Sequence, residues 1–566
     1  MILWKPSGRL DVSSEPSDLP ESVSQTHITS DALTRCKNLR TDQKGVLKLR
    51  DGSSKINTSA IATAIKLIVE QKGSRYAFAG TNIYFNETSI ASSLADAQWS
   101  AIKYNQFNDT DQQVFALNGA DRKRINGTTV AEWGITAPTS VTTAVGSLTG
   151  LTGDYNAKIT YCRKVGSVVV SESNPSPAGT TRALSNQSLS VSWAASSDSQ
   201  VTHVRVYRTL TDGEVYFHDQ DVAIGSTSVD TNTADADLGG EVAIDHDRPP
   251  LGSFVMGPIF DGTCFIIKDN LLYHCKPKQP EYWPALFFVE VGPPQSVGKC
   301  GVIHSGQVYI LTKNEIWNIL GTGEGTFLPV PMKARTGAQG IFGAVSVAGY
   351  GIYHTGVDGV YLFSQGDKNV TDPEFTRIFR GESVNGVPAV KEMETAWLHA
   401  YKKYLYFGYT SVGNDFPTNI LVLNLDNGRV AYYVYNDGSD IEIRCITTDE
   451  TNKRILVGDN TGFIRHIEDI AEETDSDTDV SWETQSKDFT LQTRLHFPRW
   501  NKYDVDASSA TSCTGSLLLN GVVHKTHTIT GNRDTRRRLV PEGNGERCAL
   551  RISGAGPVSI HVVESE

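Results

Sequence analysis

The sequence predicts an all-β protein: a β-propeller interrupted by a fibronectin-III-like β-sandwich and followed by a C-terminal β domain. Three observations support this fold class. Glycine and aromatic residues are abundant, with 50 Gly, 21 Tyr, 20 Phe and 9 Trp, a composition typical of strands and tight turns. Hairpin-like segments recur at a regular spacing, which one long interval interrupts. A length of 566 residues also predicts several domains.

The repeat is a pair of aromatic or aliphatic strands joined by a short turn of Asn, Asp, Gly or Lys, which is typical of a β-hairpin. Four consecutive turns lie near residues 269, 313, 358 and 403, about 44 to 45 residues apart. A unit of this length with about four strands is typical of a propeller blade, and we expect six to eight blades. The strand pairs span residues 76–85, 114–125, 265–274, 309–319, 351–363, 398–409 and 455–467.

The spacing breaks between Ile135 and Leu251, where we expect an inserted β-sandwich over residues 138–247. Pro138 and Pro249-Pro250 mark its boundaries, and its size and strand number favour a fibronectin-type-III-like module. Predicted strands cover residues 156–162, 189–193, 201–209 and 214–217.

The remaining boundaries follow from this insertion. Residues 1–137 and 248–480 are predicted to be the two parts of the propeller, and residues 481–566 the C-terminal β domain. One helix is predicted over Ser59–Gln71, because Ile61, Ile65 and Ile68 share one helical face. Residues 468–479 are predicted to be a solvated acidic linker.

No motif indicates a cofactor, a metal site or a catalytic centre. The eight cysteines are spread along the chain without a C-x-x-C pair, which favours buried thiols in a protein assembled in a reducing cytosol. Gly321–Gly325 lacks the third glycine of a dinucleotide loop. Asp475, Asp477 and Asp479 resemble the start of a calcium loop, but Val480 stands where that loop needs glycine. The sialidase Asp-box is absent, so we expect no enzymatic activity.

Charge is distributed unevenly along the chain. The net charge is -12, but residues 481–566 hold eleven Lys and Arg against nine Asp and Glu, which leaves -14 on residues 1–480. The insertion holds thirteen acidic against six basic residues. The one basic cluster is Arg533, Arg536, Arg537 and Arg538, and we expect it to contact a neighbouring subunit. Contact with nucleic-acid phosphate is the alternative.

The chain shows no apolar run long enough to span a membrane, in line with a mean hydropathy of -0.28. Its first residues show no apolar core of a secretory signal. We therefore expect no membrane-spanning segment and no secretion.

Several motifs together resemble tail proteins of short-tailed bacteriophages. The opening residues 33–40 (LTRCKNLR) and 45–52 (GVLKLRDG) resemble an entry strand, and residues 114–119 with 126–138 resemble a second blade. Residues 172–177 (ESNPSP) and 204–209 (VRVYRT) are similar to an inserted sandwich. Residues 358–363 and 423–430 resemble later blades. Each motif alone is a hairpin, so the resemblance rests on their order along most of the chain.

The family is the tail nozzle, also called hub or stabilisation protein. The resemblance implies a non-enzymatic homohexamer in the virion tail, made in the host cytoplasm. It implies contacts with the phage adaptor, with tail fibre or spike proteins, and with DNA that passes through the channel without sequence-specific contact. No functional residue carries over, because the motifs are structural. The alternative is a secreted or surface β-propeller that binds or cleaves glycans.

Overall fold

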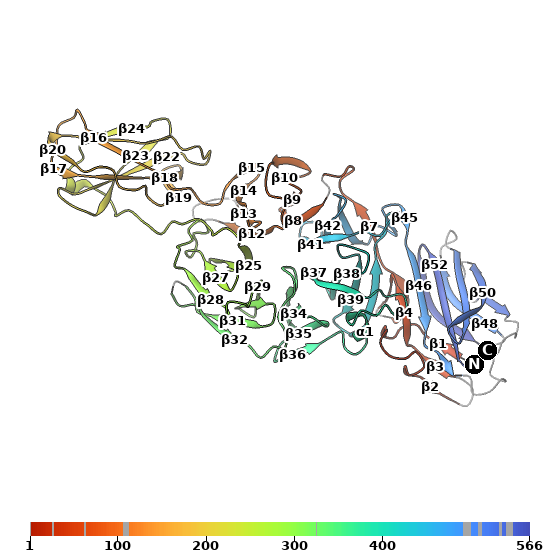
Figure 1. Cartoon of the computed structure of the whole chain (residues 1–566). Helices are drawn as coiled ribbons and strands as arrows, with labels where there is room; N and C mark the ends of the chain where they lie inside the picture. Colours follow the sequence, from red (N-terminus) through yellow and green to blue (C-terminus); the bar gives the residue numbers. More distant parts are fainter. Residues whose placement is uncertain are drawn as a thin grey trace. The chain divides into compact units, whose positions relative to one another are not determined.

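Antiparallel strands make up nearly all of the regular structure, as the computed structural model of the chain shows (Figure 1). The structure describes residues 2–24, 28–42, 44–61, 64–105, 112–323, 325–490, 500–507, 512–530, 535–538 and 547–565. The chain forms two compact units, one of residues 1–88, 311–316 and 332–566 and one of residues 89–310 and 317–331. The all-β prediction is confirmed.

Each of the seven predicted strand pairs is a hairpin in a separate sheet. Six of those sheets contain a four-stranded antiparallel meander, and the seventh contains three consecutive strands and a fourth from the N-terminal part, which we also call a meander. The first three are β8–β11 (Ile65–Gln71, Ser74–Ala79, Asn82–Phe85, Thr88–Ala91), β12–β15 (Ser100–Asn105, Gln112–Leu117, Arg122–Asn126, Thr129–Glu132) and β25–β28 (Phe254–Phe260, Thr263–Lys268, Leu271–His274, Phe288–Glu290). The next two are β29–β32 (Gly298–His304, Gln307–Thr312, Ile316–Leu320, Leu328–Pro331) and β33–β36 (Ala344–Val347, Gly351–Thr355, Val360–Phe363, Asp367–Asn369).

The last two meanders are completed differently. Strands β37–β40 (Val390–Tyr401, Tyr404–Ser411, Asn419–Asn424, Val430–Val434) form the sixth. Strands β41–β43 (Ile443–Asp449, Arg454–Asp459, Ile464–Asp469) form three quarters of the seventh, and β7 (Gly52–Lys55) from the N-terminal part supplies its fourth strand. Consecutive sheets within each unit share buried apolar cores, as consecutive propeller blades do.

The predicted helix over Ser59–Gln71 is wrong, because residues 65–71 form β8. Strand β8 pairs with β9 through a tight turn at Lys72 and Gly73, whose φ angles of 50° and 82° suit a two-residue hairpin. A register shift between Ile65 and Leu67 interrupts the alternation of buried positions. This bulge places Ile65 and Ile68 on one buried face at a three-residue spacing, which resembles a helical period. Among the described residues the one α-helix is α1 (Thr376–Phe379).

The insertion folds as three small antiparallel sheets around one core. The strands are β16 (Thr142–Val145), β17 (Leu151–Tyr155), β18 (Ala157–Val165), β19 (Val168–Glu172), β20 (Arg182–Gln187), β21 (Leu189–Ser192), β22 (His203–Thr209), β23 (Tyr216–Ala223) and β24 (Ser228–Thr231), followed by a short 3₁₀ helix at Asp235–Asp237. Val191 of one sheet and Ile159, Val204 and Val206 of another are buried in the same cluster. The finer likeness to fibronectin type III stays a prediction.

The C-terminal residues form two sheets together with the first fifty residues. One sheet has the order β2-β3-β1-β53-β48-β51, with β5 and β6 joined to β53 through β6. The other extends the sixth meander through β4, β46, β52, β49 and β50. The N-terminal strands are β1 (Ile2–Trp4), β2 (Ser22–Val23), β3 (Ile28–Ser30), β4 (Leu33–Lys37), β5 (Leu39–Thr41) and β6 (Leu47–Leu49). Strands β44 (Thr474–Asp475) and β45 (Thr478–Asp479) instead follow β7 in the sheet of the seventh meander. The C-terminal strands of the two sheets are β46 (Ser481–Ser486), β47 (Phe489–Thr490), β48 (Trp500–Ala507), β49 (Ser512–Leu519), β50 (Val522–Thr530), β51 (Thr535–Arg538), β52 (Arg547–Ala555) and β53 (Val558–Ser565).

The two ends of the chain therefore lie side by side, with Ile2 opposite Ser565 and Trp4 opposite Val563 (Figure 1). This pairing differs from the predicted division, which assigns all of residues 1–137 to the propeller. Trp4 and Leu47 share a core with Trp482 and Ile560. Strand pairing over more than 500 residues leaves no local signal in the sequence, which is why the division missed it.

Candidate functional site

The predicted arginine cluster lies on an edge strand, as far as the structure describes it. Arg536, Arg537 and Arg538 occupy successive positions of β51, and Arg533 lies outside the described residues. Among the described residues, strand β51 pairs only with β48, and Arg537 lies opposite Asn501. The proposed contact with a neighbouring subunit stays a prediction.

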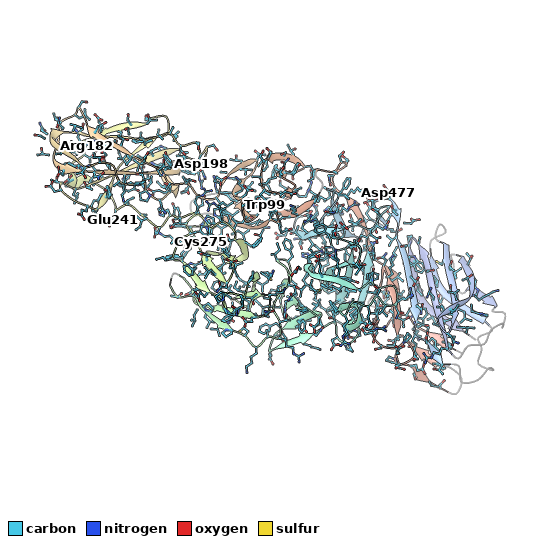
Figure 2. All side chains as sticks on the ribbon, viewed as in Figure 1. Trp99, Arg182, Asp198, Glu241, Cys275 and Asp477 are labelled. Atoms are coloured by element: carbon cyan, nitrogen blue, oxygen red, sulfur yellow. The ribbon has the colours of Figure 1, made fainter. Side chains whose placement is uncertain are left out.

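The acidic stretch 468–479 is not a linker, so that prediction is wrong. Strand β43 ends within it, and β44 and β45 form a short hairpin after a turn. The stretch divides into two sets of carboxylates. Glu468, Asp469 and Asp475 are buried and paired with Arg40, Arg454 and Arg50. The second set, Glu472, Glu473, Asp477 and Asp479, has no ion pair among the described residues, and Asp477 lies at the exposed hairpin turn (Figure 2).

Arg50 is the centre of the buried set. Its side chain is completely buried, and all five N–H donors are used. Two of them reach the carboxylate of Asp475 at 3.0 and 2.5 Å. The others donate to Asn38 Oδ1 and to the carbonyl oxygens of Asp51 and Val434. The guanidinium also lies 3.8 Å from the ring centroid of Tyr435, within the range of a cation–π contact.

The carboxylate of Asp475 is also fully paired and hydrogen-bonded. Besides Arg50 it accepts hydrogen bonds from Ser53 Oγ at 3.0 Å and from the Asn436 amide at 3.1 Å. A buried carboxylate is tolerated only when it is paired and hydrogen-bonded in this way. Asp475 thereby ties β44 to β7 and to the segment after β40.

A second buried pair lies beside the first. Arg40 contacts Glu468 and also Asp51, the latter at 2.6 Å, and the Tyr435 hydroxyl donates to Glu468 at 3.1 Å. Burial raises the pKa of Glu468, and the opposing charge of Arg40 does not cancel the effect. These charges connect N-terminal strands to the sixth and seventh meanders, so the arrangement is a structural junction.

Close approach of backbones accompanies this junction. A Cβ on Gly52 of β7 would lie 2.0 Å from the carbonyl oxygen of Thr474, so only glycine fits there. The Gly52 amide donates to the Glu472 carbonyl oxygen at 2.8 Å. Strand β7 therefore holds the hairpin β44–β45 in place by backbone as well as by charge.

A groove opens next to this junction. Its volume is about 410 Å³, and we call it the 470–473 groove. Ile470 on its wall is 77% exposed and provides an apolar surface beside two carboxylates. The groove is lined by Lys48, Leu49, Arg50, Asp51, Ile470, Glu472, Glu473, Pro557, Val558 and Ser559.

The second unit has a comparable buried charge where the insertion begins and ends. Glu281, in the loop between β27 and β28, has a side chain that is 1% exposed. Arg163 of β18 contacts it at 2.8 Å and Arg124 of β14 at 3.5 Å, and Ser171 of β19 donates to it. The inserted sandwich is thus joined to the neighbouring meanders by a buried ion pair in addition to its two chain connections.

Catalytic groups do not converge in the described part of the chain. No three His, Cys, Asp or Glu side chains among the described residues are placed to hold a metal ion. The eight cysteines are all buried and unpaired, which confirms the prediction of buried thiols. Burial raises the pKa of Cys36, Cys300 and Cys445 to about 12, so these thiols are poor nucleophiles. A buried histidine, His354, contacts Asp367 of the same sheet through Nε2 at 3.1 Å.

Sequence reasoning found the basic cluster and the acidic stretch but missed both buried ion pairs. Arg50 and Asp475 are 425 positions apart, and Arg163 and Glu281 are 118 apart. No spacing rule connects such residues. The acidity of residues 468–479 was the one visible signal, and it indicated solvent exposure because unpaired acids are normally exposed.

Comparison with known proteins identifies no family. No family model matches the chain, and no curated protein matches it. Among solved structures, the extracellular domain of the putative hybrid two-component system BT3049 from B. thetaiotaomicron is 11% identical over 93% of this chain and 70% of its own, with a TM-score of 0.28. PorZ, a surface component of the type-IX secretion system of Porphyromonas gingivalis, is 12% identical over 91% of this chain and 78% of its own, with a TM-score of 0.26.

No helix among the described residues is both long and apolar enough to cross a membrane.

Proposed function

We propose that the chain is a structural subunit of the tail of a short-tailed bacteriophage. Copies of it form a ring, a homohexamer, below the portal and adaptor, and this ring retains DNA and conducts it during ejection. The observation that carries the proposal is the order of the motifs along the chain. Residues 114–119 fall in the second meander, residues 204–209 in the insertion, and residues 358–363 and 423–430 in the fifth and sixth meanders.

The charge distribution supports a conduit that does not hold its cargo. A net charge of -14 on residues 1–480 repels phosphate, whereas each Lys or Arg contact to phosphate would add affinity through counterion release. Duplex DNA is about 20 Å wide, and the centre of a propeller is normally filled by side chains. The channel in this proposal is therefore the axis of the ring, and a monomer would not serve.

The buried ion pairs support a structural role over an enzymatic one. Arg50 and Asp475, like Arg163 and Glu281, join segments far apart in the chain and are inaccessible to a substrate. In this proposal the protein is not an enzyme, resides in the virion tail and is made in the host cytoplasm. Its partners are the adaptor, tail fibre or spike proteins, and DNA in passing.

Electron microscopy and native mass spectrometry of the purified protein test the proposal. We expect hollow rings of six copies, with a lumen wide enough for duplex DNA. A protein that stays monomeric at every concentration and ionic strength, and that is absent from virions of the phage encoding it, would refute it.

The second candidate is a surface β-propeller that binds or cleaves glycans. The two solved structures compared above are an extracellular domain and a bacterial surface component. Saturable glycan binding by the monomer, or release of sugar that one carboxylate substitution abolishes, would favour this candidate.

A further inference from the structure

We propose that the 470–473 groove is a docking site for a second copy of this chain, and that its occupant is the arginine-bearing strand β51 of that copy. This inference rests on the proposed function, because it assigns the contact that joins neighbouring subunits of the ring. The contact is head to tail: one copy offers β51, and the next offers the groove.

The groove carries negative charge that no ion pair among the described residues neutralises. Glu472 and Glu473 have no ion pair or side-chain hydrogen bond among the described residues. The other charges of the lining are already matched. Arg50 is paired with Asp475 and Asp51 with Arg40, while Lys48 lies 3.3 Å from Asp42.

The groove also offers an apolar surface beside these carboxylates. Ile470 is 77% exposed, while Val558 at the start of β53 is 6% exposed and forms part of the floor. Arginine suits such a surface, because its aliphatic stem packs on apolar groups while its guanidinium reaches a carboxylate. Lysine-rich or wholly apolar partners would match only one of these features.

The occupant is argued from charge complementarity within the same sequence. Residues 536–538 are three consecutive arginines in a chain of net charge -12. They lie on β51, which ends the path β2-β3-β1-β53-β48-β51 of its sheet. A strand in that position presents a backbone edge to a neighbour.

The two patches lie at opposite ends of one sheet, so they do not meet within one chain. On β48, Ala507 lies opposite Val558 of the groove, whereas Asn501 lies opposite Arg537. Six residues of a strand span about 20 Å, which exceeds the reach of an arginine side chain. A contact between two different patches is heterologous, and heterologous contacts generate closed rings or open filaments. This geometry therefore fits a ring, which a symmetric pairing of identical patches would not build.

Charge-reversal variants test the contact directly. The first variant carries Arg536→Glu and Arg537→Glu, and the second carries Glu472→Lys and Glu473→Lys. We expect each alone to weaken subunit association about tenfold or more, since like charges then face each other at every contact. Mass photometry and sedimentation velocity measure the fraction of rings.

An equal mixture of the two variants should form rings again. In an alternating ring the Glu-bearing β51 meets a Lys-bearing groove, and the unchanged β51 meets an unchanged groove, so every contact is complementary. The matched controls are Asp479→Lys, an exposed acid outside the groove, and Lys525→Glu, an exposed base on β50. Both controls should assemble as the wild type does.

The outcomes separate this inference from the proposed function. Wild-type rings that persist in both reversal variants would overturn the contact and leave the proposed function standing. If the wild type forms no ring under any condition, the proposed function fails and this contact fails with it. If the β51 variant assembles normally but loses a salt-sensitive affinity for duplex DNA that the wild type has, β51 is a phosphate contact and the inference is wrong.

A salt titration of the wild type adds a measurement that needs no variant. The contact predicts that rings dissociate as ionic strength rises from about 50 mM to about 500 mM, because exposed ion pairs are screened over that range. Ring stability that is unchanged or increased by salt would also overturn the inference.

Discussion

Replacing Asp475 with Asn tests whether the buried ion pair holds the N-terminal strands to the propeller. Asn keeps the size of the side chain but removes its charge, so Arg50 becomes a completely buried cation without a counterion. Removing one partner of a buried pair costs about 3–5 kcal/mol. Domains are stable by only about 5–15 kcal/mol, so the loss is a large part of the total.

The assay is scanning calorimetry combined with hydrogen exchange. A loss of this size lowers the melting temperature of the unit that contains Asp475, residues 1–88, 311–316 and 332–566, by about 4–7 °C. The amides of β7 and β44 should exchange faster, because Asp475 joins these two strands through Ser53 and Arg50. Strand β23, in the other unit, should keep its protection.

The matched control is Asp477→Asn, two residues away. Asp477 is exposed at the hairpin turn with a φ of 73°, a conformation that Asn also tolerates. We expect this change to stay within about 0.5 kcal/mol of the wild type. In a double-mutant cycle, Arg50→Ala and Asp475→Ala should be strongly non-additive. Equal effects of the two Asn substitutions, or additive costs in the cycle, would refute the reasoning.

Three further outcomes follow from other parts of the structure. Deleting residues 138–247 should leave a chain that still unfolds cooperatively, but at a lower temperature, because the buried Glu281 then loses Arg163 and keeps only Arg124 as an ion-pair partner. Adding Glu281→Gln to the deletion should recover part of the lost stability. Absence of any cooperative unfolding transition would contradict this prediction. Burial alone would raise the pKa of Asp221, but hydrogen bonds from Lys164, His218 and Arg205 hold it well below its usual range. The stability that the Asp221 carboxylate confers is present above about pH 4 and is lost as the pH falls further. Asp221→Asn should therefore reduce the fall of the melting temperature below that pH. An unchanged dependence of melting temperature on pH would contradict the assignment. None of the eight thiols should react with a disulfide reagent in the native protein, and all should react in denaturant, since every cysteine is buried; rapid labelling of the native chain would contradict the packing.

Local features of the sequence predicted local features of the structure. The hairpins at residues 76–85 and 455–467 were visible because both strands and their turn lie within about a dozen residues, and turn chemistry acts at that range. Even at this range, the β-bulge in β8 led to the wrong prediction of a helix over Ser59–Gln71. The register shift beside Ile65 reproduced a helical spacing in a strand.

For the candidate site, the sequence predicted only which charged residues cluster along the chain. The sequence shows three consecutive arginines at 536–538 and an acidic stretch at 468–479, and it gives no reason to separate Asp475 from Asp477. Burial separates them, because Asp475 meets Arg50 and Asp477 meets solvent. The groove exists only where residues near 48, 470 and 558 are brought together.

By itself, then, the sequence determined the all-β class, the repeating hairpins, the interruption between them and the burial of the thiols. The tertiary structure alone decided that β7 completes the seventh meander, that the first strand pairs with the last, and that Arg50 faces Asp475. The physical reason is range. Turns and the alternation of buried positions are specified by neighbouring residues. A pairing across 425 positions forms only after the local hairpins, and it depends on the apolar surfaces and charges that those hairpins leave exposed.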